Sequence, residues 1–391
     1  MNRHLSRRTV AKSALLASAA LLLDAGRARA ALGGLVPALP APTGRHPVGR
    51  HSCYLVDTSR RDPWASETPF RELMLTVYYP ACSVAGRAPA PQLPPQAADA
   101  FGQILPQTPL QLPGPGVDWA GTLSHSCEDA APLPGRRPVL VHSPGGGDPR
   151  GLGTTLAEEL VSHGAVVVSV DHPGDALAVE FPGTTPFRRD QVRTTVLRGD
   201  PRDQPDVFRT MIDARIADLH FVLERLRHAA DLPLPPGLAA TLDLRRLGVY
   251  GHSAGATAVS EVLHEDRRIR AGINLEGYLD SPSGELLPVA AQGVDRPLLL
   301  VGSTEFTHRR EMDRSWSALL ARAGRTVRRA LVADADHWVF TDFAAVLPQL
   351  QAAGLITAER RNAVIGSVPP AVSVPEVRRT IRRFFARHLT V

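Results

Sequence analysis

The sequence predicts an α/β fold in which a mostly parallel central sheet is covered by helices on both faces. After residue 138, short apolar segments alternate with segments of helical periodicity, which is typical of parallel strands buried on both sides. Upstream, 51–59 and 72–80 are expected as antiparallel strands at the sheet edge, the second with Leu73, Leu75, Val77 and Tyr79 at alternating positions. The chain has 391 residues, 43% of them hydrophobic, which is enough for one large core or two small ones.

The elements expected after residue 138 follow one another without an internal repeat. The strands are 138–142, 165–170, 247–250, 271–275, 297–302 and 326–332. The helices are 154–163, 207–230, 257–266 and 315–323. The longest helix, 207–230, keeps its apolar residues on a single face, so we expect that face to pack against the sheet.

Three other regions lack this regularity. Residues 31–50 are rich in Pro, Gly and Ala and are predicted to form a flexible tether. Residues 81–137 are rich in proline and are predicted as an irregular insertion within the domain, with a separate disordered linker as the alternative. Residues 177–205 are predicted as a polar loop, a candidate lid. The apolar residues expected to pack the insertion are Phe101, Ile104, Leu105 and Trp119.

The first thirty residues have the composition of an export signal. A charged start that contains Arg7 and Arg8 precedes a short apolar stretch, and an A-x-A sequence ends at Ala30. The paired arginines favour the twin-arginine route, so we expect a secreted protein. A buried N-terminal helix is the alternative. The apolar stretch is too short to cross a bilayer.

Charge and cysteine content exclude few functions. The chain has 44 basic and 39 acidic residues, and removal of 1–30, with six basic residues and one acidic residue, leaves 38 of each. A near-neutral mature protein gives no reason to expect a nucleic-acid partner. Cys53, Cys82 and Cys127 would allow one disulfide in any of three pairings, or none, and their spacing fits no zinc site.

The segment that carries the chemistry is Gly251-His252-Ser253-Ala254-Gly255, which matches the nucleophile elbow G-x-S-x-G. An apolar strand precedes it and a helix follows it, as this motif requires. A strand that turns at once into a helix strains the serine backbone and brings the positions two before and two after close together. Gly251 and Gly255 meet that need, so Ser253 is the predicted nucleophile. The alternative is an ordinary strand-to-helix turn with a solvated serine.

A serine nucleophile needs a histidine base and an acid that orients it, in the chain order serine, acid, histidine. His337 is the predicted base because it follows the last expected strand. Glu276, at the end of strand 271–275, is the predicted acid, and Asp280 is the alternative. Asp336 is a poor candidate because adjacent side chains seldom point at each other. No metal or cofactor is predicted.

The remaining requirement is a pair of backbone N–H groups that stabilise an oxyanion. One is expected from Ala254. The other is expected from the glycine loop 145–147, where Gly146 is favoured and Gly145 is the alternative. A phosphate-binding loop is the alternative, but the G-K-[ST] sequence typical of such loops does not follow. Trp338 and Phe340 are predicted either to line the substrate pocket or to lie in the core.

Together these motifs predict an α/β-hydrolase fold with a catalytic domain over 51–391. In detail, the sequence resembles platelet-activating factor acetylhydrolases of the plasma and intracellular type II class. The resemblance is carried by the glycine loop with its preceding strand, the segment 156–175, the elbow, the strand ending at Glu276 and the sequence His-Trp-Val-Phe-Thr-Asp-Phe from His337. The resemblance covers about 138–345. It implies cleavage of short or oxidised acyl chains from glycerophospholipids without calcium, and it assigns Ser253, Glu276 and His337 as triad with Gly146 and Ala254 as oxyanion donors. The family usually has aspartate where this chain has Glu276, and histidine where it has Pro144.

We therefore expect an exported serine-ester hydrolase that acts on a small-molecule or lipid ester, with a lipase, cutinase-like or polyester hydrolase as the nearest alternatives. A non-catalytic binding protein of the same fold is the alternative of another class. No obligate protein partner is expected. The C-terminal helix carries an apolar stripe that we expect to pack on the sheet; the alternative is an anchor that touches a lipid interface transiently. The residues of the stripe are Val377, Ile381, Phe384, Phe385 and Leu389.

Overall fold

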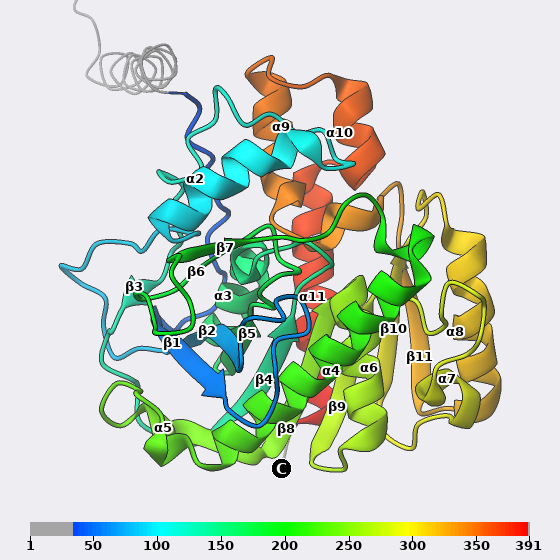
Figure 1. The fold of residues 1–391 in the computed structure, drawn as a ribbon, viewed down its shortest axis with the longest axis horizontal. Helices are drawn as coiled ribbons and strands as arrows, with labels where there is room; N and C mark the ends of the chain where they lie inside the picture. Colours follow the sequence, from blue (N-terminus) through cyan, green and yellow to red (C-terminus); the bar gives the residue numbers. More distant parts are fainter. Residues whose placement is uncertain (1–33, 390–391) are drawn as a thin grey trace, which may run out of the picture.

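The computed structural model describes residues 34–389, so the predicted export signal over 1–30 lies outside the described residues. The described chain forms a nine-stranded sheet with the order β11-β10-β9-β8-β4-β5-β2-β1-β3 (Figure 1). The six strands from β11 to β5 are parallel, whereas β2 pairs antiparallel with β5 and with β1. This is the predicted α/β-hydrolase fold with antiparallel N-terminal strands. The strands are β1 Val48–Asp57, β2 Arg71–Pro80, β3 Cys127–Glu128, β4 Arg137–Ser143, β5 Val166–Val170, β8 Leu242–His252, β9 Ile269–Leu275, β10 Leu298–Ser303 and β11 Val327–Val332.

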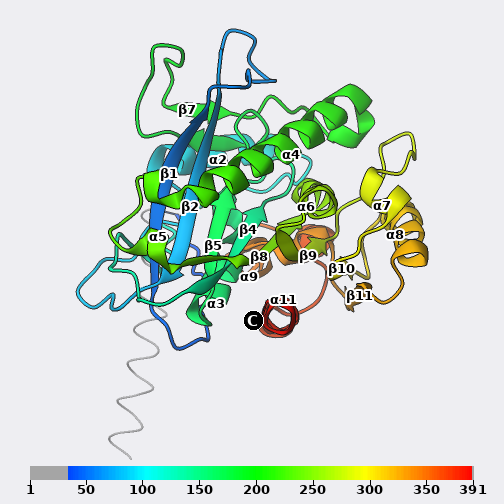
Figure 2. The ribbon, with the colours of Figure 1, turned by 90° about the horizontal axis from the view of Figure 1, so that it is seen from below.

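Helices cover both faces of the sheet (Figure 2). On one face, the apolar sides of α4, α6 and α8 pack against strand residues such as Val249 and Leu300. On the other face, α3 and α11 pack against residues such as Leu140 and Ile273. Because each strand is buried from both sides, β5 is a nearly continuous run of valine. The helices that cover the sheet are α3 Thr154–Ser162, α4 Pro205–Arg227, α6 Ala254–Glu265, α7 Pro288–Gln292, α8 Arg309–Ala323 and α11 Pro370–His388.

The proline-rich insertion over 81–137 is part of the domain. It contains one α-helix, α2 (Pro95–Ile104), which the sequence did not predict, and this helix lies beside α9 (Phe343–Ala352) and α10 (Ala358–Ile365) (Figure 1). The three helices share an apolar cluster in which Phe101, Leu105 and Trp119 are buried, as expected, and Ile104 is half-buried. The alternative of a disordered linker is therefore wrong for this segment.

The segment predicted as a flexible tether is fixed to the domain wherever the structure describes it. Thr43 donates to the carboxylate of Glu159 from its amide at 2.8 Å and from its hydroxyl at 2.7 Å. Arg378 of α11 donates to the carbonyl oxygens of Pro40 and Ala41, each at 2.8 Å. The first strand begins at Val48 rather than at residue 51. The tether prediction is wrong for residues 34–50 because these backbone groups satisfy buried charged side chains.

The predicted loop 177–205 contains a short hairpin, β6 (Ala178–Glu180) with β7 (Val192–Thr194). Three arginines tie it to the body of the domain: Arg188 to Glu72 at 3.0 Å, Arg193 to Asp62 at 2.6 Å, and Arg202 to Asp280 at 3.3 Å. Its arginine content thus reflects ion pairing with the domain. A lid role for this loop stays a prediction.

The C-terminal stripe packs as expected. All five of its apolar residues are buried in the cluster on the α3–α11 face of the sheet, so the anchor alternative is wrong for this helix. Cys53, Cys82 and Cys127 are free thiols, and Cys53 and Cys127 are buried. Within residues 34–389, no helix combines the length and the hydropathy that a membrane span requires.

Candidate active site

The elbow has the strained geometry that its sequence predicts. Strand β8 ends at His252 and helix α6 begins at Ala254, so Ser253 alone makes the turn, with φ +52° and ψ −121°. A Cβ on Gly251 would lie 2.5 Å from the backbone of Gly255, and a Cβ on Gly255 would lie 2.1 Å from the carbonyl oxygen of Ser143. Neither position can carry a side chain. Ser253 is half-buried between buried neighbours, so it is the most exposed residue of the turn.

Glu276 and His337 come together at the carboxyl end of the sheet. Glu276 directly follows β9, and His337 begins the short helix His337–Phe340 after β11. His337 Nδ1 lies 3.0 Å from Glu276 Oε2, and both side chains are buried. Ser303, at the end of β10, donates from its amide and its hydroxyl to the same carboxylate. Glu276 has φ +59°, a left-handed backbone that is rare for a residue with a long side chain.

The protonation states of this pair follow from its surroundings. Burial raises the pKa of Glu276, but the hydrogen bonds from His337 and Ser303 lower it by more, so the carboxylate is ionised at neutral pH. Burial lowers the pKa of His337, and the neighbouring His252 lowers it further, while Glu276 opposes both effects. The imidazole is therefore neutral at pH 7, with its proton on the nitrogen that faces the carboxylate.

A second histidine links this pair to the elbow. His252 Nε2 lies 3.0 Å from the carbonyl oxygen of His337, and the two ring centroids are 4.6 Å apart. Because His252 directly precedes Ser253, this contact holds the backbone of His337 beside the elbow. The sequence did not predict this role for His252, whose only signal was its position inside the motif.

The other acidic candidates have different partners. Asp280 pairs with Arg202 at 3.3 Å and lies 3.9 Å from Arg314. Asp336 accepts a hydrogen bond from the backbone amide of His337 and makes none with its ring. Among the described residues, Glu276 is therefore the carboxylate that contacts the imidazole.

The glycine loop lies against the start of α6. A Cβ on Gly146 would lie 3.6 Å from the Cβ of Ala254, which brings the two predicted oxyanion donors next to each other. Gly146 is exposed and Gly145 is buried. A Cβ on Gly145 would lie 2.5 Å from Asp148 and 2.9 Å from His252, so this position requires glycine for packing. This difference favours Gly146 over Gly145 as the residue that a substrate can reach.

A buried ion pair beneath the loop fixes its shape. Arg215 of α4 donates to the carbonyl oxygens of Pro144 at 2.6 Å and Gly145 at 2.8 Å. Its Nε lies 2.6 Å from the carboxylate of Asp175, which in turn accepts the amide of Gly147 at 2.8 Å. The sequence motifs predicted no role for Arg215, which falls on the buried side of helix α4. Arginine is rarely fully buried unless it is paired, so its position on the apolar side of a helix was the feature of the sequence that could have indicated a buried ion pair.

Ser143, the residue before the loop, is bound in a similar way. Its hydroxyl lies 2.9 Å from His172 Nε2, and His172 Nδ1 lies 3.0 Å from Asp218, which also pairs with Arg71. These side chains are all buried, so this second serine, histidine and aspartate set supports the loop and is out of reach of a substrate. Both ends of the loop are thus anchored by buried polar groups.

Aromatic and apolar side chains surround the imidazole and the loop. Phe306 stacks on His337 with centroids 4.6 Å apart, and Trp338 meets it edge-on at 4.9 Å while remaining half-buried. Phe340 is buried in a core cluster, which is the second of the two places predicted for it, and Trp338 remains a candidate for the substrate pocket. Next to Ala254, Met211 belongs to a small apolar cluster that also contains Phe208 and Leu197. Within residues 34–389, no group of His, Cys, Asp or Glu side chains has the arrangement of a metal site.

The fold and the family relationships place this chain among the carboxylic ester hydrolases with an α/β-hydrolase fold. A family model described as "Platelet-activating factor acetylhydrolase, isoform II" matches residues 236–366, a region that includes the elbow, Glu276 and His337. The chain belongs to the platelet-activating factor acetylhydrolase isoform II family.

Three similar proteins illustrate this relationship. A probable 1-alkyl-2-acetylglycerophosphocholine esterase from Arthroderma benhamiae is 27% identical over 89% of this chain and 87% of that protein. A platelet-activating factor acetylhydrolase from Cavia porcellus is 26% identical over 43% of this chain and 40% of that protein. A solved structure of a ferulic acid esterase from Streptomyces cinnamoneus is 33% identical, with a TM-score of 0.70 over 90% of this chain and 93% of that one.

Proposed function

We propose that this chain is a serine ester hydrolase that acts through an acyl-enzyme, with Ser253 as nucleophile, His337 as general base and Glu276 as the orienting acid. The observation that carries the proposal is the buried hydrogen bond between His337 and Glu276 beside a strained elbow. A serine hydroxyl is a weak nucleophile at neutral pH, and this arrangement supplies what it lacks, a neutral imidazole held in one tautomer.

In the first half of the reaction, Ser253 Oγ attacks the ester carbonyl carbon and its proton passes to His337 Nε2. Glu276 stabilises the imidazolium that forms. The carbonyl oxygen becomes an oxyanion, which accepts hydrogen bonds from the amides of Gly146 and Ala254. The tetrahedral intermediate then loses the alcohol, which takes its proton from His337, and Ser253 is left acylated.

In the second half, water attacks the acyl group and His337 takes its proton. A second tetrahedral intermediate forms on the same oxyanion donors. Its collapse breaks the bond to Ser253 Oγ, which recovers a proton from His337, and the carboxylic acid leaves. The free enzyme is restored without a metal or cofactor.

For the substrate, we propose an ester with a short acyl chain on a glycerophospholipid. The family of the chain and the name of the Arthroderma benhamiae relative support this choice. The apolar cluster of Met211, Phe208 and Leu197 beside Ala254 supplies a surface for a small acyl group.

Ferulic acid esters are a second candidate class. The Streptomyces cinnamoneus esterase shares 33% identity over nearly the whole chain, a higher identity than either phospholipid-directed relative described above. The rings of Phe306 and Trp338, both in contact with the imidazole, offer partners for the aromatic ring of such an acyl group.

We also propose that the protein is exported by the twin-arginine route, with cleavage near Ala30. The paired arginines and the A-x-A sequence support this proposal. N-terminal sequencing of the protein recovered from the culture medium tests it, and retention of the leader in the cell would contradict it.

The test of the catalytic proposal is turnover by the purified protein and by Ser253→Ala, with Ser283→Ala, an exposed serine outside the site, as the matched control. We expect Ser253→Ala to lose at least about 10³-fold in kcat and Ser283→Ala to keep full activity. Labelling with an organophosphate should add one adduct to the wild type and none to Ser253→Ala. A wild-type protein that stays unlabelled and hydrolyses no ester would indicate a non-catalytic binding protein.

A substrate panel then selects the ester class. It should contain an acetylated glycerophosphocholine, methyl ferulate, a short-chain p-nitrophenyl ester, an insoluble triglyceride and a polyester film. We expect the highest kcat/KM on the acetylated phospholipid. A higher kcat/KM on methyl ferulate would select the second candidate, and preference for the insoluble substrates would indicate a lipase or polyester hydrolase.

A further inference from the structure

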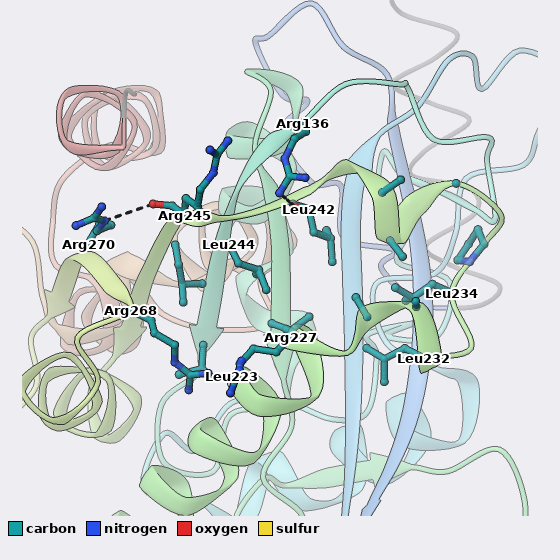
Figure 3. A pocket seen from close by; sticks show the side chains of 18 of the residues that line it. Arg136, Leu223, Arg227, Leu232, Leu234, Leu242, Leu244, Arg245, Arg268 and Arg270 are labelled. Atoms are coloured by element: carbon teal, nitrogen blue, oxygen red, sulfur yellow. Dashed lines mark hydrogen bonds between the residues drawn. The ribbon is translucent and has the colours of Figure 1, made fainter.

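We propose that a second ligand site, for a single-chain anionic amphiphile such as a long-chain carboxylate, lies at the end of the sheet opposite to Ser253. The inference goes beyond the proposed function and does not depend on it. It rests on an open pocket of about 1150 Å³ whose walls combine apolar residues with arginine alone (Figure 3).

The pocket is remote from the candidate active site. Its walls include the start of β8 at Leu242 and the start of β9 at Arg270, whereas Ser253 and Glu276 follow the ends of those strands. From Leu247 to Ser253 the strand runs for six residues, or about 20 Å at about 3.3 Å per residue. A molecule held here therefore does not occupy the site of hydrolysis.

The apolar part of the pocket comes from three consecutive segments. The last turns of α4 contribute Leu223 and Leu226, the connection over 229–240 contributes Leu232 and Leu234, and the first residues of β8 contribute further leucines. Pro235 and Pro236 also line it. Because proline fixes the backbone, this wall is preformed, and a ligand does not have to order it.

Arginine provides all of the charge in the lining. Six arginines from separate points in the chain line the pocket, and no acidic residue does. In Figure 3, Arg268 and Arg270 lie at the opposite side of the pocket from Leu232 and Leu234. Leucine side chains at one side of the pocket and guanidinium groups at the other match a ligand with an alkyl tail and an anionic head. The arginines are Arg136, Arg227, Arg245, Arg267, Arg268 and Arg270.

Four acidic residues outside the lining pair with five of these six arginines, and Asp243 and Glu224 are each shared between arginines. Asp266 and Glu224 hold Arg268 at 2.6 and 3.2 Å. Asp243 lies 3.2 Å from Arg245 but is also shared with Arg136 and Arg246. The guanidinium of Arg270 has no ion-pair partner among the described residues, and its Nε donates to the carbonyl oxygen of Arg245 at 3.4 Å.

Arg245 and Arg270 are therefore the residues that we assign to the head group. Arg245 reaches Asp243 through Nε, and its side chain is 74% exposed. Within residues 34–389 no hydrogen bond occupies the terminal amino groups of either arginine. Guanidinium groups with such free donors bind carboxylate and phosphate groups strongly.

The test is isothermal titration calorimetry of the full-length protein with monomeric dodecanoate, decanoate and dodecyltrimethylammonium below their micelle concentrations. We expect one dodecanoate per chain, and about tenfold or more weaker binding of decanoate because each buried methylene contributes about fourfold. The cationic amphiphile should not bind. Equal affinity for the cationic and anionic amphiphiles would overturn the proposal.

Variants locate the site. The double variant Arg245→Gln/Arg270→Gln should weaken dodecanoate binding at least tenfold, and so should Leu234→Asp. The control is the double variant Arg322→Gln/Arg325→Gln, which loses the same charge at exposed positions near the end of α8 and should bind dodecanoate like the wild type. Circular dichroism confirms that each variant is folded. Binding by Arg245→Gln/Arg270→Gln within twofold of the wild type would overturn the proposal. The readout needs no turnover, so it remains decisive even if the proposed hydrolase activity fails.

A last experiment distinguishes binding of a free amphiphile from binding to a membrane surface. Sedimentation with vesicles of phosphatidylcholine and phosphatidylglycerol at 7:3 should recover little protein. Binding to vesicles without binding of monomeric dodecanoate would identify the arginines as a membrane contact and contradict the proposal.

Discussion

The Nε atom of Arg215 lies 2.6 Å from the carboxylate of Asp175, and both side chains are fully buried. From this one ion pair, hydrogen bonds extend to Pro144, Gly145 and Gly147, so the pair determines how the glycine loop presents its amides. Burial of two charges is unfavourable unless their hydrogen bonds are satisfied, and here the loop satisfies them. The loop is thus positioned from below by charged groups that no substrate touches.

Neutralising Asp175 should impair turnover more than substrate binding. Asp175→Asn keeps an acceptor for the Gly147 amide but removes the charge that balances Arg215, so the loop should shift. We expect kcat to fall about ten- to a hundredfold with KM changed little, because small displacements of catalytic groups cost this much. Steady-state kinetics measures both constants. Asp206→Asn, an exposed carboxylate on the same helix as Arg215, is the control, and an equal loss there would contradict the positioning role.

Glu276→Gln should be far more damaging than Asp280→Asn. The amide keeps the shape of the side chain but cannot hold the imidazole in the required tautomer or stabilise its charged form. We expect kcat to fall about 10³- to 10⁴-fold. Asp280→Asn weakens the pair of this buried carboxylate with Arg202 but leaves the partner of the imidazole in place, so it should keep most of the activity. The reverse order of activities would reassign the acid.

The pH profile of kcat/KM should show an acid limb below pH 6.5. A general base works only when unprotonated, and burial lowers the pKa of His337 from its usual value near 6.5, so activity persists to a lower pH than a solvated histidine would allow. The acid limb of the residual activity of Glu276→Gln should lie at a lower pH than in the wild type, because the carboxylate raises the pKa of His337. The acid limb of His252→Asn should lie at a higher pH, because His252 lowers the pKa of His337. Shifts in the opposite directions would show that another group limits the reaction.

Ile381 should matter for stability alone. It is fully buried in the α11 face, so Ile381→Ala should lower the free energy of unfolding by about 2–5 kcal/mol. Arg383→Ala, on the exposed side of the same helix, should change it by less than about 0.5 kcal/mol. Urea denaturation measures both. A KM change in folded Ile381→Ala would indicate that this helix contributes to the substrate site.

Sequence patterns predicted the elements whose formation is governed by local physics. The parallel strands follow from continuous apolar runs, and the elbow follows from two glycines whose Cβ atoms would overlap backbone. Helix α2 escaped prediction because Pro94 and Pro95, which begin it, are also typical of loops, and its burial depends on residues about 250 positions later in α9 and α10.

The same distinction holds within the site. The predicted acid and base can be ordered along the chain, so the fold's known sequence of partners sufficed to predict that Glu276 and His337 form a pair, which the structure shows as a hydrogen bond. Arg215, His252 and Phe306 act through contacts with main-chain atoms or rings that no short motif encodes. The support of a site is thus harder to predict than its reactive atoms, because it depends on the packing of whole elements.

The attachment of residues 40–43 to α3 and α11 has a consequence for how the chain is made. Arg378 is 337 positions beyond Ala41, whose carbonyl oxygen it binds. Nearly the entire domain therefore has to be synthesised before this contact can form, so residues 40–43 cannot reach their final position until α11 has left the ribosome. Formation of the contact between Arg378 and residues 40–41 is then among the last events of folding.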